Sequence, residues 1–244
     1  MFEGEYLNNE RNGKGKEYYE NGKLKFEGEY INGLRNGKGI EYYDNGTLKF
    51  VGEYLNDNQW NGEGYYSKYG NIYNLKEGKG FIKEYFNEQK IFEGEYKNGE
   101  KNGYCKEYYK DGMIKFEGQY FYGKKWTGDG YDANNNIKYK IKEGRGYVKT
   151  YFYYTARLLF EGEYINGEIN GKGKEYDENG RIKYEGEYLN GLRNGKGKEY
   201  YKTFLIFEGV YLYGHKLKGK EYYFNGKLAY EGEYLNDKKW DGKG

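Results

Sequence analysis

The chain of 244 residues has no proline, one cysteine, one histidine and no apolar run long enough to cross a membrane as a helix. A single cysteine, Cys105, excludes an internal disulfide, and together with His215 it cannot supply a soft metal cluster. Only 36% of residues are hydrophobic in a count that includes Tyr, so the aliphatic core of an ordinary enzyme is missing. We therefore expect no catalytic centre, no metal and no cofactor, and a core that is thin and largely aromatic.

The charge has no dominant sign. There are 41 basic and 39 acidic residues, and the two signs alternate locally instead of forming blocks. A basic footprint for nucleic acid is not evident, so no nucleic-acid partner is expected. The low cysteine count fits a reducing compartment and predicts a cytoplasmic location. Attachment to the cytoskeleton or a membrane, and a secreted or surface location, stay open as alternatives.

What the chain does contain is repetition. A five-residue phrase returns, in which an aromatic residue is followed by Glu or Val, then Gly, then Glu, Gln or Val, and then Tyr. The phrase begins at Phe2, Phe26, Phe50, Phe92, Phe116, Phe160, Tyr184, Phe207 and Tyr230. Shortened copies lie near Tyr73 and Tyr139. This pattern predicts one continuous repeat array over residues 1–244, in which each unit contacts its neighbours. Because the chain begins and stops inside a repeat, we expect a fragment of a longer array.

Glycine spacing favours strands over helices. The chain has 41 glycines, and each glycine inside a helix costs about 1 kcal/mol relative to alanine. Asn-Gly or Asp-Gly recurs once in many units, as at Asn21-Gly22, and predicts a two-residue type I′ hairpin turn. A second loop in each unit, such as Asn32 to Asn36, is expected to be looser.

The turn at Asn21-Gly22 fixes a strand register. The predicted pairs are Glu17 with Phe26, Gly15 with Gly28 and Gly13 with Tyr30 on one face, and Lys16 with Glu27 and Lys14 with Glu29 on the other. The first face is aromatic, with Phe26 and Tyr30 covering the gap at Gly28. The second face carries direct opposite-charge pairs. This pairing leaves little unpaired positive charge.

The register also places a column of glutamates on the aromatic face. Its members are Glu17, Glu41, Glu107, Glu175, Glu199 and Glu221. Partly buried carboxylates need partners, so we expect either a bulge that moves them outward or hydrogen bonds from nearby Tyr and Lys side chains.

The spacing Phe26-x-Gly28-x-Tyr30-x-x-Gly33-x-x-x-Gly37-x-Gly39 resembles the MORN repeat, and the resemblance covers nearly the whole chain. The trailing Glu-Tyr-Tyr and Asn-Gly-Lys-Leu are similar to the MORN-variant subgroup. The resemblance implies an all-β fold: an elongated, single-layer antiparallel β-meander of tandem β-hairpin repeats, a solenoid-like ribbon. We expect about eleven units, two of them truncated.

Two regions depart from the regular repeat, near residues 57–91 and 123–159. Trp60, Trp126 and Trp240 are expected in loops one residue longer than those of neighbouring units. After the first two, the next unit is truncated, so we expect a local bend or change of twist with Trp packed over the gap. The alternative is that these rings anchor a ligand.

The leading functional prediction is a non-catalytic scaffold whose uncovered aromatic face binds a protein partner or a second copy of the chain, since a large exposed aromatic surface usually marks an interface. The candidate binding residues are Phe26, Tyr30, Tyr54, Phe92, Tyr96, Phe116, Tyr120, Tyr164 and Tyr188. Peripheral binding of anionic phospholipid, which the resemblance suggests, is possible but not favoured because the lysines are expected to be paired. A third alternative is an accessory region of a larger enzyme.

Overall fold

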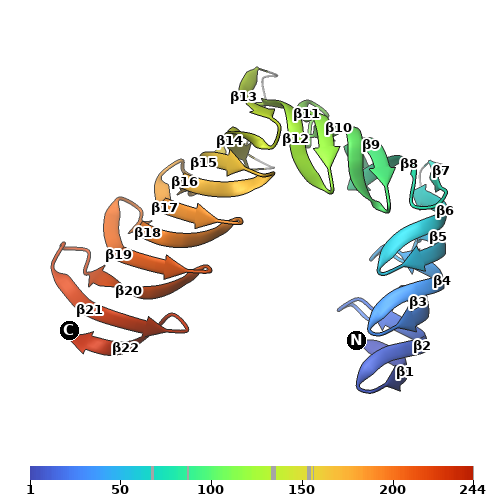
Figure 1. Ribbon diagram of the computed structural model, residues 1–244, viewed down its shortest axis with the longest axis horizontal. Coiled ribbons are helices and arrows are strands. Elements are labelled where there is room, and N and C mark those ends of the chain that lie inside the picture. Colours follow the sequence, from blue (N-terminus) through green and yellow to red (C-terminus); the bar gives the residue numbers. More distant parts are fainter. Residues whose placement is uncertain (67–68, 87, 133–135, 153–154, 156, 244) are drawn as a thin grey trace. The chain divides into compact units, whose positions relative to one another are not determined.

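The computed structural model describes residues 1–66, 69–86, 88–132, 136–152, 155 and 157–243. In these residues the chain forms 22 β-strands and no helix, and within each sheet the strands pair antiparallel in chain order (Figure 1). The all-β meander of hairpins predicted from the sequence is confirmed. Among the same residues, no helix is long and apolar enough to span a membrane.

The strands fall in two sheets, ordered β1 to β7 and β8 to β22. The first sheet contains β1 (Phe2–Leu7), β2 (Glu10–Tyr18), β3 (Leu24–Ile31), β4 (Leu34–Tyr42), β5 (Leu48–Leu55), β6 (Asn58–Tyr66) and β7 (Gly70–Leu75). The second contains β8 (Gly80–Phe86), β9 (Gln89–Lys97), β10 (Glu100–Tyr108), β11 (Ile114–Phe121), β12 (Lys124–Tyr131), β13 (Ile137–Lys142), β14 (Arg145–Tyr151), β15 (Leu158–Ile165), β16 (Glu168–Tyr176), β17 (Ile182–Leu189), β18 (Leu192–Tyr201), β19 (Phe204–Leu212), β20 (His215–Tyr222), β21 (Leu228–Leu235) and β22 (Lys238–Lys243).

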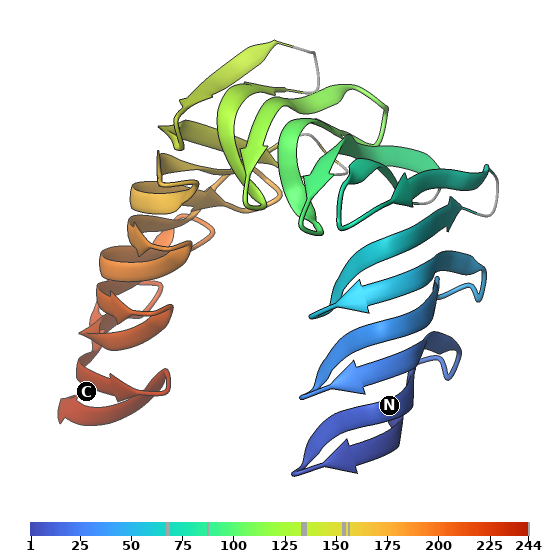
Figure 2. The ribbon, with the colours of Figure 1, turned by 45° about the vertical axis from the view of Figure 1, so that its right-hand side comes forward.

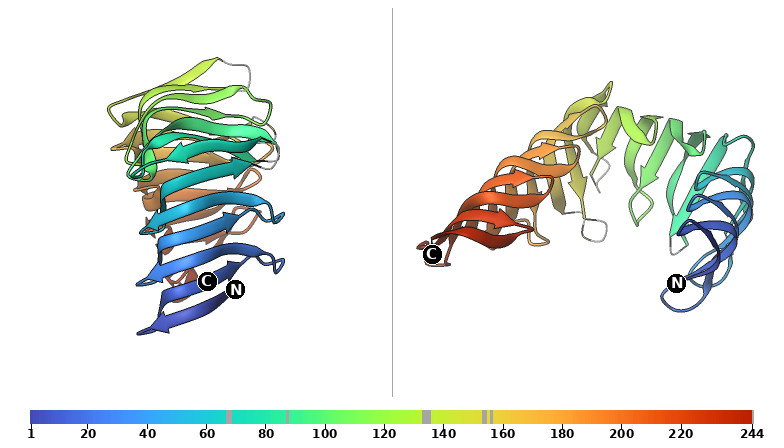
Figure 3. Two further views of the ribbon diagram at one scale, coloured as in Figure 1. Left: turned by 90° about the vertical axis from the view of Figure 1, so that its right-hand side faces the viewer. Right: turned by 60° about the horizontal axis from the view of Figure 1, so that its bottom comes forward.

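The chain divides into two compact units. The first unit comprises residues 1–112 and 119–123, and the second comprises 113–118 and 124–244. Within the first unit, β1 to β6 lie side by side as successive curled hairpins (Figure 2). Within the second, β15 to β22 repeat the same curled arrangement (Figure 3).

The two turns of a regular unit differ in length from the prediction. The turn predicted to have two residues has three, and the loop predicted to be looser has two. At Asn21-Gly22 the Gly22 N–H donates to the Tyr19 carbonyl at 3.0 Å, and the Tyr19 N–H donates to the Lys23 carbonyl at 2.9 Å. Of the residues in this turn only Gly22 has positive φ, at 78°, so the loop has three residues and closes with a glycine bulge. The prediction of a two-residue turn there is wrong, because Glu20 joins Asn21 and Gly22 in the loop, which Tyr19 and Lys23 close.

The loop expected to be loose is the tight one. Ile31 pairs with Leu34, and the two residues between them, Asn32 and Gly33, have φ of 50° and 82°. Both values lie in the left-handed region that a type I′ turn requires. Asn and Gly tolerate this region, which explains why this dipeptide recurs there.

Between the turns the predicted register is confirmed. The structure pairs Gly13 with Tyr30, Lys14 with Glu29, Gly15 with Gly28, Lys16 with Glu27 and Glu17 with Phe26. The register shifts beyond Glu17, where Tyr18 pairs with Leu24. The pattern of residue types therefore predicts the correct register, although the turn at Asn21-Gly22 has three residues and not the predicted two.

A second irregularity interrupts each regular hairpin near its tight turn. Because Gly28 pairs with Gly39 and Tyr30 pairs with Arg35, Glu29 lies opposite a bulge centred on Gly37. Gly37 has φ of 105°, and a Cβ atom on it would collide with the Glu29 carboxylate. The Glu29 carboxylate accepts the Lys38 N–H at 2.9 Å. Glycine is thus required both for the backbone conformation and for the approach of the carboxylate.

The tryptophans lie in strands, so their prediction as loop residues is wrong. Gly52 pairs with Gly62, and a bulge of one residue places Trp60 within β6. The segment that joins the paired glycines is one residue shorter than that between Gly28 and Gly39, not longer.

The prediction that Trp packs over the truncated unit is confirmed at two sites. The Trp60 carbonyl accepts the Gly78 N–H at 2.7 Å, and a Cβ on Gly78 would lie 2.7 Å from the Trp60 ring. Trp126 covers Gly144 in the same way, with an N–H···O distance of 2.7 Å. Gly78 and Gly144 lie in the short turns β7–β8 and β13–β14. The two predicted irregular regions include residues 67–68, 87, 133–135, 153–154 and 156, which lie outside the described chain.

Candidate functional site

The aromatic face of the hairpins is buried, which contradicts the expectation that this face is uncovered. Phe26 and Phe50 are 0% exposed, and the rings alternate along the sheet in edge-to-face contact. The Phe26 ring centroid lies 5.5 Å from that of Tyr30 and 5.0 Å from that of Tyr54. A Cβ on Gly28 would lie 2.6 Å from the Phe26 ring, so the glycine provides the space into which the ring folds, as predicted.

Most of the predicted binding residues share this burial. Phe26, Tyr30, Tyr54, Phe92, Phe116, Tyr120 and Tyr188 are buried, whereas Tyr96 and Tyr164 are half-buried. The physical reason is that a curled hairpin folds its rings against glycine backbone and against the next hairpin. The structure does not test whether these residues bind a partner. At the seven buried residues, however, the exposed aromatic surface from which binding was predicted is absent.

Basic side chains complete the cover over the rings, and sequence reasoning missed them. The Arg35 guanidinium carbon lies 4.1 Å from the Phe26 ring centroid, and that of Arg193 lies 4.0 Å from the Tyr184 centroid. Lys101 and Lys216 lie over Phe92 and Phe207 in the same way. A cation over a ring face is favourable. The sequence signal was present, since each of these four residues is the second residue after the glycine of a tight turn.

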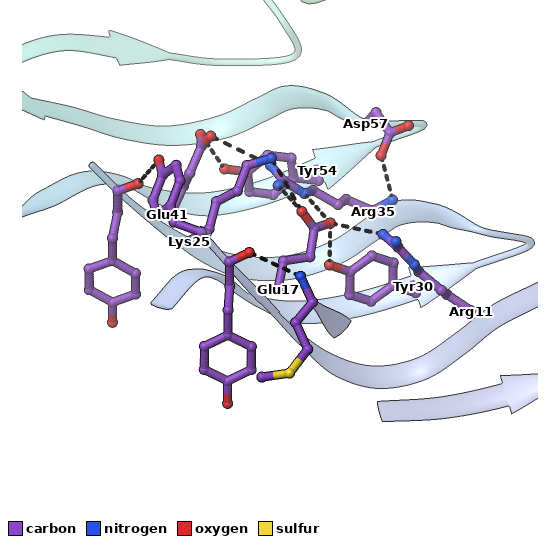
Figure 4. Close-up of polar contacts among 12 residues, drawn as sticks. Arg11, Glu17, Lys25, Tyr30, Arg35, Glu41, Tyr54 and Asp57 are labelled. Atoms are coloured by element: carbon purple, nitrogen blue, oxygen red, sulfur yellow. Dashed lines mark hydrogen bonds and ion pairs between the residues drawn. The ribbon is translucent and has the colours of Figure 1, made fainter. Parts of the chain in front are cut away.

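The buried glutamates are satisfied by these cations and by tyrosine hydroxyls (Figure 4). Glu17 accepts a hydrogen bond from the Tyr30 hydroxyl at 2.8 Å and from Arg35 Nη2 at 2.9 Å. Arg35 also lies 3.6 Å from Glu41, which receives hydrogen bonds from Tyr54 and Lys49. The predicted column of glutamates is confirmed here, with partners of the predicted kind and arginine in addition.

These contacts change the acidity of the groups. Burial raises the pKa of Glu17, but hydrogen bonds from Arg35 and Tyr30 and the positive charges of Arg35 and Lys25 outweigh it, and the net pKa is lowered to about 2. Burial and the Glu17 hydrogen bond raise the pKa of Tyr30 well above its usual range. Glu17 is therefore ionised and Tyr30 protonated at neutral pH, which suits a structural contact.

The same pattern recurs in the second unit. Glu175 accepts hydrogen bonds from Tyr188 at 2.8 Å and from Arg193 Nη2 at 2.7 Å. Arg193 also forms an ion pair with Glu199 at 2.6 Å. An arginine held between two glutamates on successive repeats links one hairpin to the next. The aromatic face is accordingly an interior with a charged cover.

The opposite face carries an open groove. In the second unit the groove has a volume of about 970 Å³ and runs over β16 to β21. Glycine backbone lines it, together with Tyr147, Val210 and rows of charged side chains. In the first unit a groove of about 580 Å³ lies on the matching face of β1 to β4. Because side chains alternate between the two faces of a strand, the glycine positions present only backbone to this face, and the Lys and Glu side chains on either side form the walls.

The two lysine rows of the second-unit groove differ in their partners. We call Lys174, Lys198 and Lys220 the paired row, because each makes an ion pair across the strands, with Glu185, Glu208 and Glu231 at 3.7, 4.0 and 3.5 Å. We call Lys172, Lys196 and Lys218 the free row. These three side chains are exposed and make no ion pair among the described residues. The predicted charge pairing holds for one row only.

The remaining candidate residues have structural surroundings. Cys105 is a buried free thiol, and burial raises its pKa to about 12, so the reactive thiolate is scarce at neutral pH. Trp240 is 71% exposed on β22, unlike Trp60 and Trp126. A ligand-binding role for the three Trp residues stays a prediction. Among the described residues, no group of three His, Cys, Asp or Glu side chains could hold a metal ion.

Stacked hairpins with ring-accepting glycines define a β-hairpin repeat protein. The MORN repeat model matches residues 26–48, 92–114, 160–180 and 184–203, and the MORN repeat variant model matches 11–32 and 217–236. The chain belongs to the MORN repeat family, as its sequence pattern predicted. MORN repeats in general take part in protein or membrane interactions.

Comparisons with individual proteins add no functional information. No curated protein sequence matches this chain. One similar solved structure is titled "Crystal Structure of TcdB2-TccC3-TEV", with 10% sequence identity and a TM-score of 0.19. The match covers 89% of this chain and only 14% of that one. A similarity of this size supports no argument about the function.

Proposed function

We propose that this chain is a non-catalytic scaffold that binds a protein segment in the groove of its second unit. The observation that carries the proposal is the open groove over β16 to β21, with its glycine floor and charged walls. Bare backbone allows a partner chain to approach closely, and flanking charges can orient it. We assign the interface to this groove and not to the aromatic face. Self-association through the aromatic rings was expected because they were predicted to be exposed, and they are buried.

Two features favour the groove over the aromatic face as the interface. The rings already pack against glycine, against each other and against Arg or Lys, so a partner would have to displace these contacts. The groove floor requires no such displacement, since only backbone of the glycine positions lies between its charged walls. A cytoplasmic location is part of the proposal, because the single cysteine is a buried free thiol.

The proposal is tested by crosslinking from the groove. A photo-crosslinking amino acid replaces Val210 in the full chain, and in a control variant it replaces Tyr223, which is 60% exposed outside the groove. We expect a discrete protein to crosslink from position 210 and not from 223. The identified protein, once purified, should bind the unmodified chain and be blocked by Val210→Trp. Equal crosslinking from both positions, or no binding by the purified protein, would contradict the proposal.

The membrane alternative has one observation in its favour. The free lysine row makes anionic phospholipid less unfavourable as a partner, since these lysines are not neutralised by ion pairs with any described residue. Flotation with phosphatidylcholine vesicles, with and without phosphatidylserine, tests this alternative. Binding that requires phosphatidylserine would favour it, and equal or absent binding would count against it.

A further inference from the structure

The free lysine row suggests which kind of protein segment the groove accepts. We propose that the second-unit groove binds an acidic α-helical segment of a partner protein, with carboxylates seven residues apart on the helix contacting Lys172, Lys196 and Lys218. This inference rests on the proposed function and specifies the chemistry of its partner.

For two of the three lysines the structure gives the reason why no ion pair forms. Lys172 pairs across the strands with Glu187, but the Glu187 carboxylate accepts the backbone N–H of Lys196 at 3.0 Å. It is thereby withdrawn from the Lys172 ammonium group. Lys196 itself pairs with Val210, which has no charge to offer. Lys218 lies opposite Glu233 without an ion pair among the described residues.

The same diversion of carboxylates occurs elsewhere in the array. Glu163 accepts the Lys172 N–H at 3.2 Å, and in the first unit Glu29 accepts the Lys38 N–H at 2.9 Å. A Cβ on Gly171 or Gly195 would collide with the diverted carboxylate. In these three hairpins the bulge binds one carboxylate to its backbone, and Lys14 and Lys172, the lysines opposite Glu29 and Glu187, stay exposed.

The spacing of the row fits a helix. Lys172, Lys196 and Lys218 lie on β16, β18 and β20, each just before a glycine of one continuous row of paired glycines. Alternate strands of a sheet lie about 9.6 Å apart. Seven residues of an α-helix rise about 10.5 Å and return to nearly the same face. In an extended strand, by contrast, every third residue points to the opposite face.

The groove also suits the rest of such a helix. Between the lysines the floor is glycine backbone with Val210, which offers close contact to small apolar side chains of the partner. The paired row lies beside the free row and is neutralised by its own glutamates, so it adds little positive potential to the groove. The carboxylates of Glu187 and Glu233 also line the groove and keep its excess of positive charge small.

That small excess argues for a peptide over a membrane surface. Attraction to an anionic bilayer grows by roughly 1 kcal/mol for each basic residue near the surface, so it requires several unopposed cations. Here three free lysines lie among two carboxylates inside a groove. A chain that enters the groove can place each carboxylate beside one ammonium group, whereas a lipid surface meets the averaged charge.

The test uses the full chain and a synthetic amphipathic helical peptide with Glu at every seventh position. A matched peptide carries Gln at those positions. Binding is followed by fluorescence anisotropy at low and at physiological salt. The groove variant is Lys172→Gln with Lys196→Gln and Lys218→Gln. The control variant has the same loss of charge at exposed lysines outside the groove, through Lys202→Gln, Lys227→Gln and Lys238→Gln.

We expect the Glu peptide to bind, and to bind about tenfold or more weakly to the groove variant, since three exposed ion pairs are lost. The control variant should keep the affinity, and the Gln peptide should bind about as weakly as the Glu peptide binds the groove variant. Circular dichroism of both variants checks that they remain folded.

Three outcomes would overturn the inference, and they differ in their consequence for the proposed function. Equal binding of the Glu and Gln peptides would leave a protein-binding groove that does not recognise carboxylates. Binding of phosphatidylserine vesicles through the free row, without peptide binding, would favour a membrane partner and also contradict the proposed function. Absence of binding to either probe would reject the acidic helix and leave the proposed function to the crosslinking from position 210.

Discussion

The two faces of the same hairpins differ in the burial and the ion pairing of their basic side chains. On the aromatic face of β4, Arg35 is largely buried, covers Phe26 and forms ion pairs with both Glu17 and Glu41. Three residues further on, Lys38 points to the groove face and is exposed without an ion pair among the described residues. One strand thus carries one basic residue that joins repeats and another that is free for a partner. Lys38 lies across the strands from Glu53, and the Glu53 carboxylate accepts a hydrogen bond from Asn61 Nδ2 at 2.7 Å instead of pairing with the lysine.

The largest expected effect comes from removing the buried cation. Arg35→Met leaves the carboxylates of Glu17 and Glu41 buried without their guanidinium partner, and should lower the free energy of unfolding by about 3–5 kcal/mol. Lys38→Met, on the same strand, should change it by less than about 0.5 kcal/mol. Urea denaturation followed by circular dichroism measures both. Similar losses for the two variants would remove the contrast between the faces.

The pH dependence of stability tests the same network without changing its packing. The pKa of Glu17 is about 2 in the folded chain against an ordinary value of 4.5, so its contribution is complete above pH 4.5 and is lost as the pH falls toward 2. The loss amounts to about 3 kcal/mol. Glu17→Gln should flatten this part of the stability profile. Glu20→Gln, in the exposed β2–β3 turn, is the charge-matched control, and an equal flattening in both would count against the assignment.

The tryptophans allow a comparison between repeats. Trp60→Ala removes the ring that covers Gly78 and should cost about 2 kcal/mol, because the ring is only half-buried. Trp240→Ala removes a ring that is 71% exposed and should cost less than about 0.5 kcal/mol. Thermal or urea unfolding of the two variants distinguishes them. A loss for Trp240 as large as that for Trp60 would show that exposure does not separate these sites.

The smallest effect on stability is expected in the groove, where binding should change instead. Val210→Glu places a carboxylate opposite Lys196 and gives that lysine the partner it lacks. An exposed pair contributes less than about 1 kcal/mol, so the unfolding midpoint should hardly move. The affinity for the Glu peptide should fall. An unchanged affinity would mean that Lys196 does not contact the ligand.

The sequence was most informative where residue types repeat at fixed spacing. The pairing of Lys16 with Glu27 and of Gly15 with Gly28 was predicted, because a one-residue slip would move every side chain to the other face. Turn geometry was less predictable. Asn-Gly occurs in both turns of a unit, and only the structure distinguishes the two-residue turn at Asn32-Gly33 from the three-residue turn at Asn21-Gly22.

The candidate site was mostly not predictable, for reasons that individual residues illustrate. Glu27 and Glu29 look equivalent in the sequence, each opposite a lysine. Glu27 pairs with Lys16 at 3.5 Å, whereas Glu29 binds a backbone N–H of the bulge. Cross-strand register gives Cα partners, but it does not say which way a flexible carboxylate turns. Lys172 is free because Glu187 turns to the backbone in the same way.

By itself, the sequence determined that the chain is a MORN-type array of antiparallel hairpins, that aromatic rings alternate with glycine on one face, and that charge lies on the other. These properties follow from periodicity and residue size. The tertiary structure decided that the rings are enclosed, that Arg35 and Arg193 link glutamates of successive repeats, and that one lysine row is free. These properties depend on how each hairpin curls against the next, which a one-dimensional register leaves open.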